Sequence, residues 1–305
     1  MTRHPVTVRR TLPAAAQFQI TAALVILAAS LQAVEPGLPS KTAVFAAAAR
    51  AVGAKDPNRA RRNPDYLAIR FLGPRERAIL PDYPMDALDL NYAGAMKQLG
   101  YALPVSSLAF RTKAFDTAML DALQDGARQV VILGAGFDSR GYRFESQLRG
   151  VRFLEVDYLP TQEYKKLRVK EVLGAVPPNV FFVPVDFTKD RLIDQLMKSG
   201  YSRDEKTFFL WEGVTFYLPE SAVKDTLHFV RDNAAPGSRI AFDYTVSTDR
   251  NVDNPESRYA KWGEPWLFGF PPDGASSYVR REGLDVISDT VLVQRICIAT
   301  VRYAP

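Results

Sequence analysis

The sequence has very few of the residues that build metal centres and disulfide frameworks. Among its 305 residues there is one cysteine, Cys297, and there are two histidines, His4 and His228. A single cysteine excludes an internal disulfide and a cysteine-based zinc cluster. Two histidines leave little for a histidine metal site or a Ser-His triad, and neither a phosphate-binding P-loop nor a His-Glu-x-x-His motif is present. We therefore predict no metal site, and we expect the thiol, which lies in an apolar strand-like run, to be buried and inert.

A strong charge of one sign is also missing. The net charge is +5, and much of the basic excess lies in arginines between residues 59 and 77, where proline and acidic residues are interspersed. A nucleic-acid-binding surface would show a denser basic stripe, so we predict no nucleic-acid partner. The length allows one large α/β domain, or one domain with appendages.

One apolar stretch near the N-terminus has two interpretations. Residues 14–33 follow Arg3, Arg9 and Arg10, and residues 20–31 are nearly all apolar. This pattern resembles a signal peptide or a short anchor, whose preceding positive charges would place the rest of the chain outside the cytoplasm. The apolar part is short for a membrane span. We favour the other interpretation, an extra helix of a cytoplasmic protein that packs on its own chain or makes peripheral contact with the membrane.

The following ninety residues predict helices only. Ser40 is a typical N-cap before an alanine-rich helix that extends to about Val52, and Pro64 is placed to begin a second helix. Further helices are expected over 86–99 and 106–123. We therefore predict three parts: an N-terminal extension with the apolar segment (1–37), an all-helical cap (38–126) and an α/β domain (127–305).

The stretch 129–144 carries the strongest signal in the chain. Residues 130–133 form a continuous branched apolar run, which is typical of a strand buried on both faces. Gly134, Ala135 and Gly136 follow directly, and small residues there permit a tight turn and the close approach of a ligand. The third glycine of the dinucleotide fingerprint is missing. Taken alone, the turn fits a nucleotide-like ligand or a tight turn without a ligand.

From residue 129 onward, strands and helices alternate, which predicts a doubly wound parallel sheet. The expected strands cover 130–133, 151–156, 180–185, 207–211 and 239–244. The expected helices between them cover 164–173, 190–197 and 220–233. Two final strands are expected within 285–301, on either side of Asp289 and Thr290.

Three consecutive expected strands carry an acidic residue just past their carboxyl ends: Asp157, Asp186 and Glu212. The carboxyl ends of parallel strands border the ligand crevice. In that crevice the first acid is placed to bind ribose hydroxyls, the second an exocyclic amine and the third an ammonium group. Each acid alone fits a helix cap or a solvated loop equally well. Together, after the glycine turn, they favour a ligand with a ribose, an adenine and a cationic amino-acid end, which is S-adenosyl-L-methionine.

Four ordered motifs carry a resemblance to a known family. They are Val-Ile-Leu-Gly-Ala-Gly-Phe-Asp-Ser-Arg at 131–140, Leu-Glu-Val-Asp at 154–157, Val-Pro-Val-Asp-Phe at 183–187 and Trp-Glu-Gly-Val-Thr-Phe-Tyr-Leu at 211–218. With them the chain resembles the leucine carboxyl methyltransferase family over about residues 38–303. The resemblance implies a Rossmann-like methyltransferase sheet with a helical cap, and S-adenosyl-L-methionine as cofactor. It also implies O-methylation of a carboxylate or hydroxyl on a small molecule.

The resemblance further implies contacts to the cofactor, residue by residue. Gly134 and Gly136 would pass under its methionine part. Asp157 would bind the ribose hydroxyls. Asp186, together with the backbone of Phe187, would hold the adenine.

The other implied contacts concern the amino-acid end of the cofactor and the methyl transfer. Glu212 would lie near that end or near the reacting centre, and Arg111 would pair with the cofactor carboxylate. Glu212 and Tyr217 are the candidates for catalytic proton handling, which a hydroxyl acceptor requires and a carboxylate acceptor does not. Three neighbouring residues are candidates for closing over the site: Ser40, Lys41 and Thr42.

The acceptor side shows only an aromatic tendency. Residues 262–278 form either an acceptor wall or a packed surface loop, and their aromatic residues include Trp262, Trp266, Phe268 and Phe270. Two other functions stay open. One is a non-catalytic or membrane-tethered S-adenosylmethionine-binding protein. The other, less favoured, is a nicotinamide-dependent oxidoreductase, against which the missing third glycine argues.

Overall fold

The structure is a computed structural model that describes residues 39–185, 190–291 and 294–302. The predicted N-terminal extension and two predicted adenine contacts, Asp186 and Phe187, therefore lie outside the described residues. Within the described ranges, no helix is long and apolar enough to cross a membrane.

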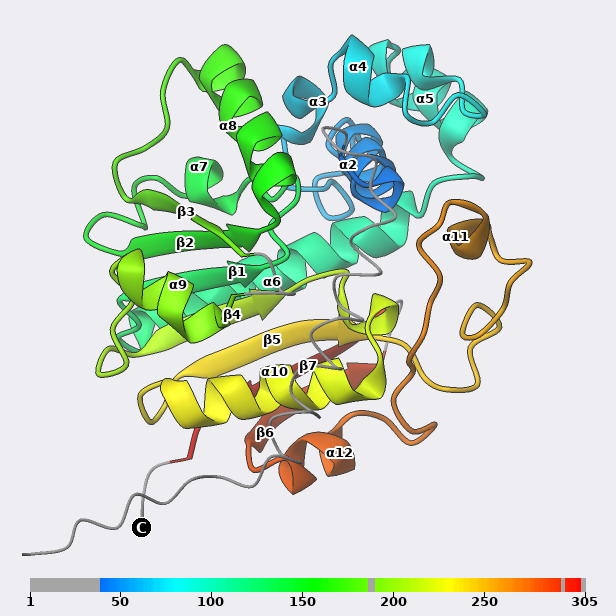
Figure 1. The fold of residues 1–305 in the computed structure, drawn as a ribbon. Helices are drawn as coiled ribbons and strands as arrows, with labels where there is room; N and C mark the ends of the chain where they lie inside the picture. The colour runs from blue at the N-terminus through cyan, green and yellow to red at the C-terminus, as the bar shows by residue number, and fades with distance from the viewer. Residues whose placement is uncertain (1–38, 186–189, 292–293, 303–305) are drawn as a thin grey trace, which may run out of the picture.

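A seven-stranded sheet forms the centre of the molecule (Figure 1). Its strands are β1 (Gln129–Leu133), β2 (Arg152–Asp157), β3 (Val180–Pro184), β4 (Thr207–Trp211), β5 (Arg239–Tyr244), β6 (Asp285–Val291) and β7 (Arg295–Thr300). The order across the sheet is β3-β2-β1-β4-β5-β7-β6. β1 to β5 pair in parallel, and β7 is antiparallel to both of its neighbours. The predicted doubly wound α/β sheet is confirmed, and the strand order reverses between β1 and β4, where ligands bind in such folds.

The boundary predicted between the last two strands was wrong. Asp289 and Thr290 lie inside β6, where they pair with Cys297 and Ile296 of β7. The Asp289 carboxylate accepts hydrogen bonds from the backbone N–H groups of Ala275 and Ser276. Asp289 is therefore a strand residue, and its side chain fixes the start of a neighbouring helix.

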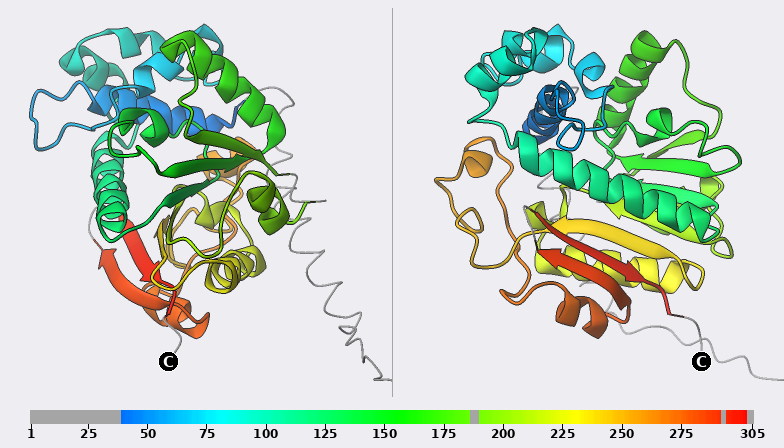
Figure 2. Two further views of the ribbon diagram at one scale, coloured as in Figure 1. Left: turned by 90° about the vertical axis from the view of Figure 1, so that its left-hand side faces the viewer. Right: turned by 180° about the vertical axis from the view of Figure 1, so that it is seen from behind.

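Alternate residues of the central strands face two separate hydrophobic cores. Val130 and Ile132 of β1 belong to one core, whereas Val131 and Leu133 belong to the other. The first core is covered by the long helix α6 (Val105–Gln124), and the second by α10 (Glu220–Asn233) with α9 (Leu192–Lys198) (Figure 2). This two-sided burial explains why β1 is apolar at four consecutive positions, 130–133, rather than at every second one.

The helices that precede the sheet place most of their buried apolar residues in the first core. They are α2 (Lys41–Gly53), α3 (Ala68–Phe71), α4 (Pro74–Arg77), the 3₁₀-helix η1 (Met85–Asp89), α5 (Tyr92–Leu99) and α6. Ser40 caps α2 as predicted, since its Oγ accepts from the backbone N–H of Ala43. The single helix predicted over 86–99 is two elements, because Asn91 caps a new helix by accepting from Gly94 N–H. The predicted division of the chain at residue 126 stays a prediction. The last helix of the predicted cap, α6, packs directly against β4 and β5 of the sheet.

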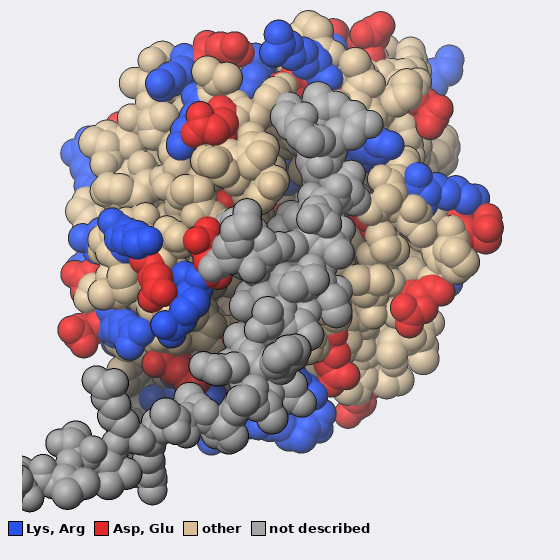
Figure 3. Space-filling model, in the orientation of Figure 1, with Lys and Arg blue, Asp and Glu red and all other residues tan. Residues whose placement is uncertain are grey.

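The remaining helices are short or lie on the outside of the sheet. They are α7 (Arg140–Arg143), α8 (Leu159–Leu173), the 3₁₀-helix η2 (Thr215–Tyr217), α11 (Arg258–Lys261) and α12 (Ser276–Arg281). Cys297 lies in β7 and is fully buried, as predicted, and burial raises the pKa of its thiol. On the face of the molecule shown in Figure 3, basic and acidic side chains are interspersed.

Candidate functional site

A pocket of about 610 Å³ opens at the carboxyl ends of the parallel strands. One side is formed by the glycine turn after β1, by Asp157 at the end of β2, by Glu212 after β4 and by Asp243 near the end of β5. The other side is formed by α2 and by the segment around α11. The pocket therefore lies at the strand reversal. It brings together the described residues that were predicted to bind the cofactor or to act in catalysis, which are Arg111, Gly134, Gly136, Asp157, Glu212 and Tyr217.

The backbone of the glycine turn explains why these positions hold glycine. Gly134 has φ +74° and Gly136 has φ +41°, values at which other residues are strained. A Cβ on Gly134 would stand 2.9 Å from Cγ2 of Val214. The N–H groups of Gly134 and Ala135 both donate to the carbonyl of Val156. The turn is therefore tied to the end of β2, and its residues line the pocket.

Asp157 is fixed against this turn. Its Oδ2 accepts from the N–H of Gly136 at 2.7 Å, and its Oδ1 accepts from its neighbour Tyr158 N–H at 2.7 Å. Burial raises the pKa of Asp157, while these two N–H groups and the nearby charge of Lys165 oppose the rise. A carboxylate oxygen can accept more than one hydrogen bond, so both oxygens keep acceptor capacity for a pair of hydroxyl groups.

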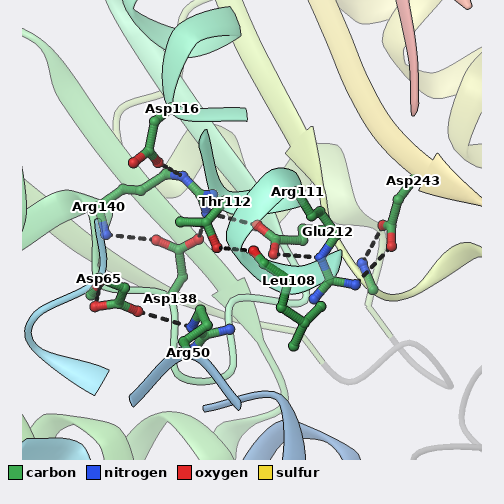
Figure 4. A network of polar contacts seen from close by, with 12 residues as sticks. Arg50, Asp65, Leu108, Arg111, Thr112, Asp116, Asp138, Arg140, Glu212 and Asp243 are labelled. Atoms are coloured by element: carbon green, nitrogen blue, oxygen red, sulfur yellow. Dashed lines mark hydrogen bonds and ion pairs between the residues drawn. The ribbon is translucent and has the colours of Figure 1, made fainter. Parts of the chain in front are cut away.

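Glu212 lines the pocket and lies between two arginines (Figure 4). Its Oε1 is 2.9 Å from Nε of Arg111, and its Oε2 is 2.8 Å from Nη1 of Arg140. Burial alone would raise the pKa of Glu212, but the charges of Arg140 and Arg111 outweigh it and lower the pKa to about 2. Glu212 is therefore an anion that is held in place at every ordinary pH.

Arg111 is shared between Glu212 and a second carboxylate, Asp243. Nη1 of Arg111 is 2.8 Å from Oδ2 of Asp243, whose Oδ1 accepts from the N–H of Gly213 at 2.6 Å. Asp243 is 3% exposed and lines the pocket. We did not predict it from the sequence, because it stands inside the expected strand 239–244. The available signal was an acid within an otherwise apolar strand that is buried on both faces.

The ion pairs continue beyond Glu212 and Arg111, as Figure 4 shows. Nε of Arg140 is 2.8 Å from Asp116, and Arg140 also pairs with Asp138. On the cap side, Nε of Arg50 is 2.9 Å from Asp65. Buried charges are tolerated when they are paired, and this network joins α2 and α6 to the loops after β1 and β4.

The start of α2 is bound to the segment after α11 by Glu264. The Glu264 carboxylate accepts from Ser40 Oγ at 2.8 Å, from Lys41 N–H at 2.9 Å and from the N–H and hydroxyl of Thr42. Ser40, Thr42 and Glu264 line the pocket. The sequence did not reveal Glu264, which lies 222 or more residues away from its partners. Ser40 and Thr42 contribute side chains at the pocket, whereas Lys41 contributes its backbone to this link.

Tyr217 and two other aromatic residues line the same side of the pocket. Trp266 stacks on Tyr259 with ring centroids 4.7 Å apart. Burial, followed by the charge of Glu264, raises the pKa of Tyr217 well above its ordinary value. Its phenol therefore stays protonated at neutral pH.

The aromatic residues predicted within 262–278 divide into two groups. Trp266 lines the pocket, but Trp262 packs on Phe45 with ring centroids 5.3 Å apart. Phe268 and Phe270 pack on Tyr278 of α12. Most of this segment is therefore packed structure, and Trp266 is its aromatic contribution to the pocket.

Comparisons with known proteins point to one family. The model of the leucine carboxyl methyltransferase family matches residues 43–231. A protein of Mycobacterium sp. (strain KMS), named provisionally as an S-adenosyl-L-methionine-dependent methyltransferase, is 33% identical over 245 residues, which cover 76% of each chain. YktD of Bacillus subtilis (strain 168), named in the same provisional way, is 35% identical over 147 residues, 46% of this chain and 48% of that protein. The match thus spans about half the length of YktD.

One solved structure with a similar arrangement is described as an O-methyltransferase family protein from Burkholderia thailandensis. It is 14% identical, with a TM-score of 0.43, and the match covers 69% of this chain and 64% of that one.

Proposed function

This chain belongs to the leucine carboxyl methyltransferase family, and we propose that it is an S-adenosyl-L-methionine-dependent methyltransferase that methylates a carboxylate on a small molecule. The observation that carries this proposal is the pocket at the strand reversal. There the glycine turn, Asp157 and the buried Glu212 lie on one side of a single cavity.

The described residues fit this cofactor at two of its parts. Asp157 is held by two backbone N–H groups in a position to accept from the ribose hydroxyls. The glycine turn, with Gly134 and Gly136 at positive φ, would permit the close approach that the methionine part needs. These two contacts are part of the proposal, as is the assignment of Asp186 and Phe187 to the adenine.

Methyl transfer from this cofactor needs little covalent help, because the sulfonium supplies an already activated methyl group. The contribution of the protein is to bind and align the two reactants and to exclude water. In our proposal the fixed Glu212 anion faces the amino-acid end of the cofactor. Tyr217, which keeps its proton, donates a hydrogen bond that orients the acceptor.

The choice of a carboxylate acceptor over a hydroxyl follows from the two candidate bases. Glu212 has a pKa of about 2 and is covered by Arg111 and Arg140. The raised pKa of Tyr217 keeps its phenol protonated. Neither group is suited to take a proton at neutral pH. A carboxylate arrives ionised and needs no base, whereas a hydroxyl must be deprotonated.

The test uses S-adenosylmethionine with a radioactive methyl group and separate panels of small carboxylic acids and phenols. Methyl esters are hydrolysed by mild base and release volatile methanol, whereas methyl ethers survive. We expect base-labile product from the carboxylic acids, and none with the Asp157→Ala variant. Base-stable product would overturn the carboxylate assignment and direct attention to Asp249, an acid that lines the pocket. Cofactor binding with no transfer to any acceptor would favour the non-catalytic alternative.

We also propose that the protein works in the cytoplasm, where the cofactor is made. Cell fractionation should find an intact chain that starts at Met1 in the cytoplasm or peripherally on the inner face of the membrane. A shorter chain that begins near residues 31–34 in the exported fraction would contradict this.

A further inference from the structure

We propose that Arg50 is a second arginine that binds the carboxylate of the cofactor, beside Arg111. This inference rests on the proposed function, because it assigns a residue to one group of the same ligand. It concerns a residue on α2, at the opposite wall of the pocket from the loops that follow β2 and β4.

Helix α2 lies across the glycine turn. A Cβ built on Gly136 would have the methyl group of Ala43 as its nearest neighbour, at 3.7 Å. Two turns further along the same helix, Nη2 of Arg50 donates to the carbonyl of Phe137 at 3.0 Å. The helix therefore carries a positive charge onto the turn that would run under the methionine part of the cofactor.

The guanidinium of Arg50 is held in one orientation. Its Nε donates to Oδ2 of Asp65 at 2.9 Å. Asp65 is fixed in turn, since its Oδ1 accepts from Ser139 Oγ at 2.7 Å and from Ala68 N–H at 3.1 Å. Arg50 is 9% exposed as a whole residue. A side chain fixed in this way loses little further conformational freedom when it binds a ligand.

One edge of this guanidinium has no acceptor in the protein. Across the described ranges, no residue accepts a hydrogen bond from Nη1 of Arg50, although Arg50 lines the pocket. Nη1 is not sealed off from solvent, in contrast to Nη2 of Arg140, which is fully buried without a partner. A nearly buried arginine that lines a cavity and has an unpaired edge is suited to an anion, and carboxylates match its planar geometry.

Arg50 and Arg111 both line the pocket, as does Glu212. The positive charge of Arg50 is, after Arg140 and Arg111, the third that lowers the pKa of Glu212. Lys41, the other cation that the sequence offered on α2, is not among the residues that line the pocket. Two guanidinium groups are therefore available to the carboxylate, one from α2 and one from α6.

Two ligands that differ in one group isolate this contact. S-adenosylhomocysteine carries the carboxylate, and S-adenosyl-3-thiopropylamine is the same molecule without it. Isothermal titration calorimetry would measure the affinity of both ligands for the wild type and for the variants Arg50→Met and Arg59→Met. Arg59 is exposed and has no described partner in the structure, so Arg59→Met is the control for loss of one arginine away from the pocket.

We expect Arg50→Met to weaken S-adenosylhomocysteine binding by tenfold or more and to change binding of the decarboxylated ligand less than twofold. That selectivity is what the loss of one hydrogen bond to a charged group predicts. Arg59→Met should leave both affinities unchanged. Arg50→Lys, which keeps the charge but not the planar fork, should show a smaller loss with the same selectivity.

Equal weakening of both ligands by the Arg50 variants would mean that Arg50 only supports the fold, and would overturn the inference. Unchanged affinity for both ligands would overturn it as well. If Arg50→Met does not fold, the selectivity of Arg50→Lys decides in the same way. A wild type that binds neither nucleoside would refute the proposed function, and this inference with it. That outcome differs from a wild type that binds both ligands with equal strength, which refutes the inference alone.

Discussion

Replacing Glu212 by glutamine tests the buried ion pairs that Glu212 makes with Arg111 and Arg140. Glutamine keeps the size and hydrogen-bonding shape of the protonated acid, but it removes the charge between Arg111 and Arg140. The side chain of Glu212 is 10% exposed, so solvent screens these pairs little. The perturbation is therefore the loss of a buried anion with both arginines left in place.

The magnitude follows from the pKa of Glu212. Its ordinary value is 4.5, and in the folded protein it is about 2. At 1.36 kcal/mol for each unit, the charged form stabilises the folded state by about 3 kcal/mol relative to the protonated form. We expect Glu212→Gln to lower the free energy of unfolding by about that amount at pH 7, which lies in the range seen when one partner of a buried ion pair is removed.

The pH dependence has a definite sign. A group whose pKa is depressed on folding stabilises the protein above its unfolded pKa and loses that contribution as the pH falls through its folded pKa. The difference between wild type and Glu212→Gln should therefore be full above about pH 5 and should shrink as the pH falls from about 4.5 towards 2. Urea unfolding followed by circular dichroism at several pH values would measure it. Equal stability of the two proteins at pH 7 would refute the reasoning.

Three further predictions concern the cofactor side of the pocket and the phenol. Asp157→Ala should weaken S-adenosylmethionine binding by tenfold or more while the fold survives, since a hydrogen bond to a charged group contributes roughly 1.5–3 kcal/mol; unchanged affinity by calorimetry would contradict its role at the ribose. Gly134→Val should abolish cofactor binding, because a Cβ there meets Val214 at 2.9 Å and the backbone has φ +74°; normal binding would show that this turn is not the site. Tyr217→Phe should keep kcat within about tenfold, because the raised pKa of the phenol excludes it as a base; a far larger loss, with a changed pH profile, would show that the phenol handles a proton.

The sheet could be predicted from the sequence because its signals are local. The apolar run 130–133 is buried on both faces, and acids placed after successive strands converge at one sheet edge. Asp157 and Glu212 could be found in this way, since the end of a strand is visible in the chain. The glycines could be found because the turn needs positive φ.

The partners of these residues could not be predicted, because they meet only in the folded chain. Glu264 accepts from the start of α2 across 222 or more residues, and no local pattern marks a carboxylate as the cap of a distant helix. Asp243 was hidden within an expected strand, and the placement of Arg50 depends on Asp65, 15 residues away. The boundary predicted at Asp289 was wrong for the same reason, since its role as a cap for α12 is a tertiary contact.

The central claim is that the pocket at the strand reversal binds S-adenosylmethionine. The most direct measurement is calorimetric titration of the purified full-length chain with this cofactor, with S-adenosylhomocysteine and NAD as competitors. The account predicts saturable binding of one cofactor per chain that S-adenosylhomocysteine displaces and NAD does not. No binding of S-adenosylmethionine, or tighter binding of NAD at the same site, would contradict it.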